Sequence, residues 1–123
     1  MKKKNKNTIL KRRKEFRYHP TNCKGKDGKT IVINHPTYIF LEEGNLYVFV
    51  TITHSNNVND SIVIKLRKNP NPKDQRDSYW VAEIRKDNIK NFGKKHNSWN
   101  IDELDDEAIR TFFEIKKDGS AIG

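Results

Sequence analysis

Residues 30–53 read TIVINHPTYIFLEEGNLYVFVTIT, and this stretch decides the fold class. Its apolar residues are mostly β-branched or aromatic, and they alternate with polar residues or run continuously, as in β-strands. The pattern predicts strands over 30–33, 37–41 and 46–53. The four residues EEGN between the last two strands are typical of a hairpin loop that contains glycine.

Two more short strands follow, with a loop between them. SIVIKL at 61–66 and SYWVAEI at 78–84 have strand composition, and the segment between them contains two prolines, which exclude a central strand. Residues 18–30 are dense in Gly, Pro, Asn and Asp and predict a loop. Five short strands predict a mainly β fold, either a small, strongly bent sheet or an SH3-like barrel.

The C-terminal part of the chain has a helical pattern. Ser98 or Asn100 can cap a helix over about 100–117, because acidic residues fill its first turns and apolar residues recur on one face. The acidic residues at 102–107 are interpreted as the solvated outer face of this helix, with a contact to the basic N-terminal segment as the alternative. The sequence therefore predicts one α+β domain over 18–123 with a C-terminal α-helix.

The excess positive charge lies almost wholly at the N-terminus. The chain has 25 Lys and Arg against 16 Asp and Glu, a formal net charge of +9. Residues 1–17 contain nine of these basic residues and one acid, so the rest of the chain is close to neutral. This block predicts a flexible arm over 1–17 that either contacts phosphates, through residues such as Lys11, Arg12 and Arg13, or acts as a solubility tail.

Length and composition exclude several classes of protein. The 123 residues fit a single domain and are too few for a large doubly wound or barrel-type cofactor enzyme. No apolar run approaches the roughly 20 residues of a membrane span, and no signal-peptide segment follows the basic N-terminus. The single cysteine, Cys23, cannot form an internal disulfide. We therefore expect a cytoplasmic protein without a membrane partner.

The spacing of potential ligands predicts no metal and no other cofactor. The sequence has no cysteine pair with zinc spacing and no His-x-x-x-His motif, and its four histidines are scattered. It also lacks the Lys-Ser/Thr that follows the glycines of a phosphate-binding loop.

His35, Thr53 and His54 are the candidate catalytic residues, because Thr53 and His54 lie at the end of the long predicted strand 46–53 and His35 precedes another predicted strand. Metal-free RNA cleavage needs a group that takes the 2′-hydroxyl proton and donors that stabilise the developing phosphorane charge. Histidine titrates in the range that general acid–base catalysis requires. The structural alternative is that Thr is simply a favoured strand residue and that His-Ser-Asn-Asn is an ordinary strand exit.

The loop between 61–66 and 78–84 is rich in cations and amides. It surrounds Asn69-Pro70-Asn71-Pro72 and is interpreted as a binding surface for single-stranded nucleic acid, although Asn and Pro are also ordinary turn residues. The candidate nucleic-acid-binding residues here are Lys65, Arg67, Lys68, Lys73 and Arg76. Four aromatic residues, of which the two Trp are expected in the core, are either stacking platforms or core residues: Tyr47, Tyr79, Trp80 and Trp99.

The order of these features resembles the PemK/MazF family of small toxins over about residues 34–92. His35-Pro36 before TYIFL is similar to the family's Arg-Pro entry into a strand, and VFVTIT ends in a Thr as the corresponding family strand does. SIVIKL, followed by SYWVAEIRKDNIKNF, is similar to the later strands and to the basic stretch after them.

The resemblance implies a PemK-like barrel, usually a homodimer, that cleaves single-stranded RNA without a metal and is inhibited by an antitoxin. It places Thr53 at the position of the family's catalytic Thr and His35 at the position of its catalytic Arg. Because Arg is a permanent cation and neutral His is not, acid–base chemistry by His35 or His54, or a cation from Arg67, has to replace that Arg.

Three functions are consistent with the sequence. The first is a metal-independent endoribonuclease toxin. The second is a non-catalytic nucleic-acid-binding protein of a phage or mobile element. The third is a small inhibitor that binds another protein through the acidic helix face at 102–107.

Overall fold

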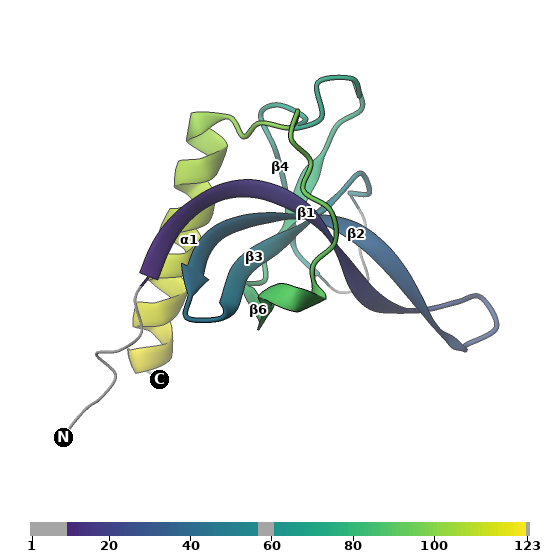
Figure 1. Ribbon diagram of the computed structural model, residues 1–123, viewed down its shortest axis with the longest axis horizontal. Coiled ribbons are helices and arrows are strands. Elements are labelled where there is room, and N and C mark those ends of the chain that lie inside the picture. Colours follow the sequence, from purple (N-terminus) through teal and green to yellow (C-terminus); the bar gives the residue numbers. More distant parts are fainter. Residues whose placement is uncertain (1–9, 57–60, 123) are drawn as a thin grey trace.

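The computed structural model describes residues 10–56 and 61–122, which form a curled antiparallel sheet and a long helix (Figure 1). The mainly β fold with a strongly bent sheet and a C-terminal helix is thereby confirmed. The elements in chain order are β1 (Leu10–Lys24), β2 (Thr30–Glu43), β3 (Leu46–Thr53), β4 (Val63–Lys65), β5 (Tyr79–Val81), β6 (Arg85–Asn88), the 3-10 turn η2 (Ile89–Asn91) and α1 (Glu103–Ile122).

β3 is the centre of the sheet. The strand order is β1-β2-β3-β5-β4, and β6 pairs with the first half of β3. The end of β3 pairs instead with β5, through Ile52 opposite Trp80 and Thr53 opposite Tyr79. Register shifts in β1 and in β2 add to the bend, because a bulge increases the local twist of a strand.

The sheet buries apolar residues on both faces. One face packs against α1, and its core contains Phe40, Val50 and Trp80 together with Ile109 of the helix. The opposite face carries a smaller cluster of Ile39, Tyr47 and Phe49, which is covered by residues of η2 and the segment that follows it. Burial on both faces explains why the middle of β2 and of β3 is continuously apolar in sequence rather than strictly alternating.

β1 corrects two expectations about the N-terminal third of the chain. Residues 10–17, predicted as part of a flexible arm, and residues 18–24, predicted as a loop, form one strand that pairs with β2 from Leu10 to Lys24. Its basic side chains mostly face solvent, while Phe16 is buried in the core. Residues 1–9 of the predicted arm lie outside the described residues.

The far ends of β1 and β2 extend beyond the body of the sheet as a two-stranded ribbon (Figure 1). The ribbon turns at residues 25–29, where Gly28 has a φ of 83°, a left-handed conformation that glycine adopts without strain. A hairpin joins β2 and β3 as predicted, but its turn is limited to Gly44, with a φ of 61°, and Asn45, because Glu42 and Glu43 belong to β2. The strands predicted over 30–33 and 37–41 form the single strand β2.

Other predicted boundaries also shift. The strand predicted over 61–66 is limited to β4, and the strand predicted over 78–84 ends at Val81, before the separate strand β6. α1 begins at Glu103 and extends past 117. Its cap is Asp102, not Ser98 or Asn100, because Asp102 Oδ1 accepts from the backbone N–H groups of Leu104 at 2.9 Å and Asp105 at 3.3 Å.

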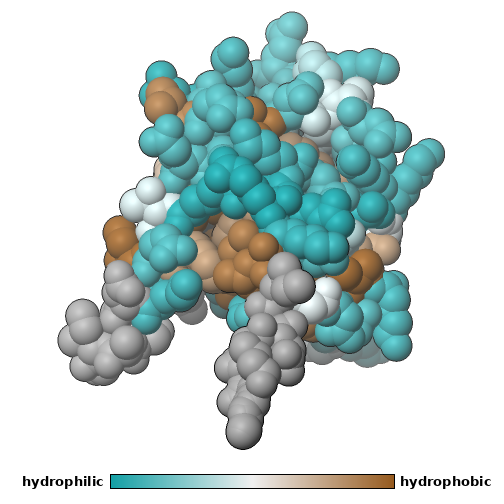
Figure 2. Space-filling view, turned by 60° about the vertical axis from the view of Figure 1, so that its left-hand side comes forward, coloured by the Kyte–Doolittle hydropathy of each residue, from teal (hydrophilic) through white to brown (hydrophobic). Residues whose placement is uncertain are grey.

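The α1 side of the molecule has a largely hydrophilic surface with separate apolar patches (Figure 2). Exposed apolar residues in this part of the fold include Leu104 and Ile115 on the helix. Within 10–56 and 61–122, no helix combines the length and apolar character that a membrane crossing requires.

Candidate functional site

The three candidate catalytic residues lie together in a pocket of about 480 Å³ at the end of β3. His35 comes from β2, and Thr53 and His54 come from the end of β3 and the residue after it. The pocket exists because the pairing of β2 with β3 stops at Thr37 opposite Thr51, after which β3 pairs with β5. The two strands therefore separate, and polar side chains line the opening between them.

The pocket also receives Arg76, from the loop between β4 and β5. Because His35 stands at the position of the family's catalytic Arg, another cation such as Arg67 was expected at the site. Arg67 does not line this pocket. Its backbone N–H instead donates to both carboxylate oxygens of Asp105 at 3.0 Å. Arg76, predicted only as a phosphate contact, is the cation that lies beside His54 and Thr53.

Asp74 connects His54 to Arg76. Its Oδ2 lies 3.3 Å from Nε2 of His54 and accepts from Nη2 of Arg76 at 2.7 Å, while its Oδ1 accepts from Nε of Arg76 at 3.0 Å. The hydrogen bonds from Arg76 hold the pKa of the Asp74 carboxyl well below its usual range, so this residue is a carboxylate at neutral pH. Asp74 could not be identified from the sequence, because its partners are defined by the folding of the loop.

His54 is held between two acceptors. Its Nδ1 lies 3.3 Å from the backbone carbonyl oxygen of Asp77, and its Nε2 faces Asp74. The histidine side chain is 35% exposed, so the ring remains accessible from the pocket. Acceptors at both ring nitrogens can orient the imidazole.

The Asn-Pro-Asn-Pro loop positions Asp74 and Arg76. Asn69 Oδ1 accepts from the backbone N–H of Asn71 at 2.9 Å, and its Nδ2 donates to the carbonyl oxygen of Arg76 at 3.0 Å. Asn71 Oδ1 accepts from the backbone N–H of Lys73 at 3.0 Å. These amide groups make turn contacts within the loop, which favours the turn interpretation of Asn69 and Asn71 over direct contacts with bases.

Most of the basic residues of this loop line a second hollow of about 310 Å³, which shares Asn71, Asp74 and Arg76 with the first. Lys65, Arg67 and Lys68 belong to it, and Lys73 does not. Lys65 lies 3.4 Å from Asp77, and Arg67 lies 3.8 Å from Asp102, with both basic side chains more than half exposed. Such exposed ion pairs contribute little to stability, so these cations are available to an anionic ligand.

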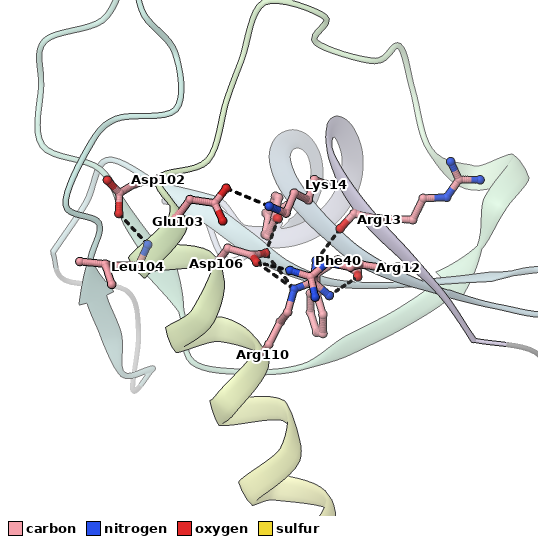
Figure 3. Close-up of polar contacts among 10 residues, drawn as sticks. Arg12, Arg13, Lys14, Phe40, Asp102, Glu103, Leu104, Asp106 and Arg110 are labelled. Atoms are coloured by element: carbon pink, nitrogen blue, oxygen red, sulfur yellow. Dashed lines mark hydrogen bonds and ion pairs between the residues drawn. The ribbon is translucent and has the colours of Figure 1, made fainter.

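Two of the three predicted phosphate contacts in β1 are committed to the fold. Arg12 Nη2 donates to the buried Asp106 at 3.0 Å, as Figure 3 shows. Arg13 is paired with Glu42 of β2. Lys11 is exposed on the same strand. A phosphate that binds Arg12 or Arg13 would therefore have to compete with these intramolecular ion pairs.

The acidic start of α1 is also not simply a solvated face. Asp105 and Asp106 are buried, and Asp106 accepts hydrogen bonds from Tyr38 Oη at 2.6 Å, Arg12 at 3.0 Å and Arg110 at 3.0 Å (Figure 3). Burial favours a higher pKa for Asp106, but the hydrogen bonds from Arg110 and Tyr38 outweigh it and lower the pKa below its usual value. The alternative interpretation, contact between the acidic run and the basic N-terminal segment, is correct for Asp106, which accepts from Arg12, and for Glu103, which pairs with Lys14. Asp105 instead accepts from the backbone N–H of Arg67.

The aromatic candidates divide between core and pocket. Tyr47 and Trp80 are buried in the two core clusters, whereas Trp99, half-buried, lines the pocket beside His54. Tyr18 of β1 also lines the pocket, and sequence reasoning missed it because it lies in a segment predicted to be a loop. Among residues 10–56 and 61–122, no group of three or more His, Cys, Asp and Glu side chains has the arrangement of a metal site.

Comparisons with protein-family models, with curated proteins and with solved structures find no match for this chain.

Proposed function

We propose that the protein is a metal-independent endoribonuclease that cleaves single-stranded RNA, with a PemK/MazF-like barrel. The observation that carries this proposal is the convergence of His35, Thr53, His54 and Arg76 on one pocket. These residues come from two strands and a distant loop, and together they supply acid–base groups, a hydroxyl and a permanent cation. Metal-free phosphodiester cleavage requires that combination.

In the proposed reaction the RNA 2′-oxygen attacks the adjacent phosphorus while the bond from phosphorus to the 5′-oxygen breaks. His35 accepts the proton of the 2′-hydroxyl, and His54 donates a proton to the leaving 5′-oxygen. The products are a 2′,3′-cyclic phosphate and a 5′-hydroxyl. His54 is placed for the role of acid because its ring lines the pocket and is oriented by Asp74 and the Asp77 carbonyl.

Arg76 and Thr53 stabilise the charge that develops on the phosphorane oxygens. Arg76 uses Nε and Nη2 to hold Asp74, and a guanidinium has five N–H donors, so Nη1 remains for a phosphate oxygen. Asp74 acts as a positioning residue that sets the orientation of both Arg76 and His54.

The proposal includes the biological setting that the resemblance implies. The protein would act on cytoplasmic RNA as a toxin, form a homodimer and be inhibited by an antitoxin. Growth arrest on expression, relieved by inactivating substitutions in the pocket, is the expected cellular result.

The direct test is incubation of the purified full chain with a long single-stranded RNA in EDTA, followed by mapping of the cut ends. We expect cleavage with 5′-hydroxyl and cyclic phosphate ends, and loss of at least about 100-fold in rate for His54→Ala and for His35→Ala. Lys90→Ala is the matched control, because this exposed residue lies in η2, near the opposite end of β3 from Thr53. Unchanged cleavage by the double histidine variant, or cleavage only when a divalent ion is added, would contradict the proposal.

The second candidate is non-catalytic binding of nucleic acid, which the cation-lined hollow of Lys65, Arg67, Lys68 and Arg76 favours. It predicts tight binding of the same RNA with no cut ends, and an affinity that falls as salt is raised. Substitution of Arg67 and Lys68 together by Ala should then lower the magnitude of the slope of log affinity against log salt by about 1.4, because each phosphate contact with a single strand contributes about 0.7.

A further inference from the structure

One wall of the pocket is aromatic. Tyr18 and Trp99 both line the pocket, and His96 links them. The His96 ring is stacked on Trp99, with centroids 4.3 Å apart and planes 15° apart, and Tyr18 meets His96 edge-on at 4.4 Å. Tyr18 of β1 and Trp99 of the segment before α1 thus form an aromatic surface of the pocket, and the His96 ring packs against both without lining the pocket itself.

This aromatic surface is held in place by backbone hydrogen bonds. The N–H of Gly93 donates to the carbonyl of Tyr18, and the N–H of His96 donates to the carbonyl of Phe16, both at 2.8 Å. The rings are therefore positioned before any ligand binds, which lowers the entropy that binding has to overcome.

The core does not account for Tyr18. The side of the sheet that faces α1 is filled by fully buried residues such as Trp80 and Phe16, whereas Tyr18 is 42% exposed. Trp99 touches the core through Phe16 but is only half-buried. An exposed tyrosine beside a half-buried tryptophan, both at one pocket, is an arrangement suited to a planar apolar ligand.

The rest of the pocket limits what that ligand is. Arg76 and His54 lie in the same pocket and suit a phosphate, and the exposed Lys94 and Lys95 flank His96 in the chain. Burial lowers the pKa of His96, so the aromatic wall itself is uncharged at neutral pH. A planar group next to a phosphate is the chemistry of a nucleotide whose base is unpaired.

We propose that Tyr18 and Trp99, supported by His96, form a nucleobase-stacking subsite that holds one unpaired base of an RNA strand beside His54 and Arg76. The inference rests on the proposed function in that it takes an RNA strand as the ligand of this pocket. Because every base has a stacking face, the subsite selects single strands over duplexes rather than one base over another.

Tryptophan fluorescence of the full chain can test the subsite without any cleavage. The probe is a seven-nucleotide 2′-O-methyl RNA, which has no 2′-hydroxyl to react, compared with an abasic strand of the same length. The base-bearing strand should quench the emission of Trp99 and bind about tenfold more tightly than the abasic strand. Trp80 gives a constant background, because it is 2% exposed and lies in the core.

Substitutions separate stacking from charge. Tyr18→Leu should weaken binding of the base-bearing strand about tenfold and leave the abasic strand unaffected, whereas Tyr18→Phe should bind both strands as the parent does. Trp99→Phe should abolish most of the quenching. An unchanged thermal midpoint for Tyr18→Leu verifies that the variant is folded. If the variant does not fold, binding of the base-bearing and abasic strands by the unsubstituted protein still tests the subsite.

Equal affinity and equal quenching for the two strands would overturn the subsite. That result is distinguishable from failure of the proposed reaction. Quenching without RNA cleavage would support the subsite and contradict the proposed nuclease activity. Cleavage in EDTA without quenching would support the nuclease activity and contradict the subsite.

Discussion

Two clusters in this molecule use the same chemical groups in opposite surroundings. At the start of α1, the side chain of Asp106 is about 1% exposed and its carboxylate accepts hydrogen bonds from Arg110, Arg12 and Tyr38. At the pocket, the carboxylate of Asp74 receives Arg76 and faces His54, and the Arg76 side chain is 69% exposed. The cluster around the buried Asp106 joins the helix to β1 and β2, through Arg12 and Tyr38. The open cluster keeps donors directed toward solvent, so it can bind a substrate.

The difference is physical rather than compositional. A buried carboxylate has lost its hydration and depends on every donor around it, so removal of any partner is costly. Asp74 itself is 14% exposed, but its partner Arg76 is 69% exposed and regains water when the pair is broken, so this ion pair adds little to stability. Substitutions in the Asp106 cluster should therefore lower the stability of the fold, whereas substitutions in the Asp74 cluster should lower only the activity.

The largest expected effect is on the buried cluster. Asp106→Asn should lower the free energy of unfolding by about 3 kcal/mol, because Arg110 and Arg12 lose the charge that they share. Urea unfolding followed by circular dichroism measures this value. Asp105→Asn on the same turn is the matched control, since Asn can keep an acceptor for the backbone N–H of Arg67. Equal destabilisation by the two variants would show that the Asp106 cluster has no special role.

The next effect concerns the open cluster. Arg76→Ala should lower the rate of RNA cleavage about 100-fold, as is usual when a donor to a developing oxyanion is removed, and should leave the urea midpoint unchanged. Arg76→Lys keeps the charge but not the two-pronged contact with Asp74, so its rate should lie between those of the parent and of Arg76→Ala. A fall in the urea midpoint of Arg76→Ala would remove the distinction between the clusters.

A smaller effect is expected from the hydroxyl of Tyr38. Tyr38→Phe removes one hydrogen bond of 2.6 Å to Asp106 while keeping the ring, and should cost about 1.5 kcal/mol in unfolding free energy. In the parent, burial and the hydrogen bond to Asp106 raise the pKa of Tyr38, so its hydroxyl stays protonated and donating at neutral pH. Tyr79→Phe on β5 is the control for loss of a tyrosine hydroxyl and should leave stability unchanged.

The smallest effects appear on changing the pH. The pKa of Asp106 is lowered in the folded state, so its contribution to stability is complete above about pH 4 and is lost as the pH falls through the folded value. The pKa of Asp105 is raised, chiefly by burial, so its effect has the opposite sign, and stability is lost as the pH rises through its folded value. The unfolding free energies of Asp105→Asn and Asp106→Asn, each relative to the parent, should therefore shift in opposite directions between pH 3 and pH 6. A shift in the same direction would contradict this assignment.

The sequence predicted the centre of the fold better than its edges. β3 has the bounds of the predicted strand, because eight residues of β-branched and aromatic character with a glycine hairpin before them leave little alternative. β1 was missed because its local composition is that of a charged arm. Its Lys and Arg residues are tolerated in a strand since their partners, Glu42, Glu103 and Asp106, are supplied by distant elements.

The candidate site divides in the same way. His35, Thr53 and His54 were identifiable because strand ends place polar side chains next to a buried sheet, and the structure brings all three to one pocket. Asp74 and Tyr18 were not identifiable, since each belongs to a segment whose role depends on which strand or loop it meets.

By itself, the sequence determined that this chain forms a bent β-sheet with a C-terminal helix, because period-two apolar patterns and turn residues act over short distances. Only the tertiary structure decided which charges are structural and which are available. Arg12 and Arg76 are both arginines in cation-rich segments, yet one donates to a carboxylate buried under α1 and the other lies in an open pocket. Ion pairs depend on distance in space and on exposure to water, and neither quantity can be read from neighbours in the chain.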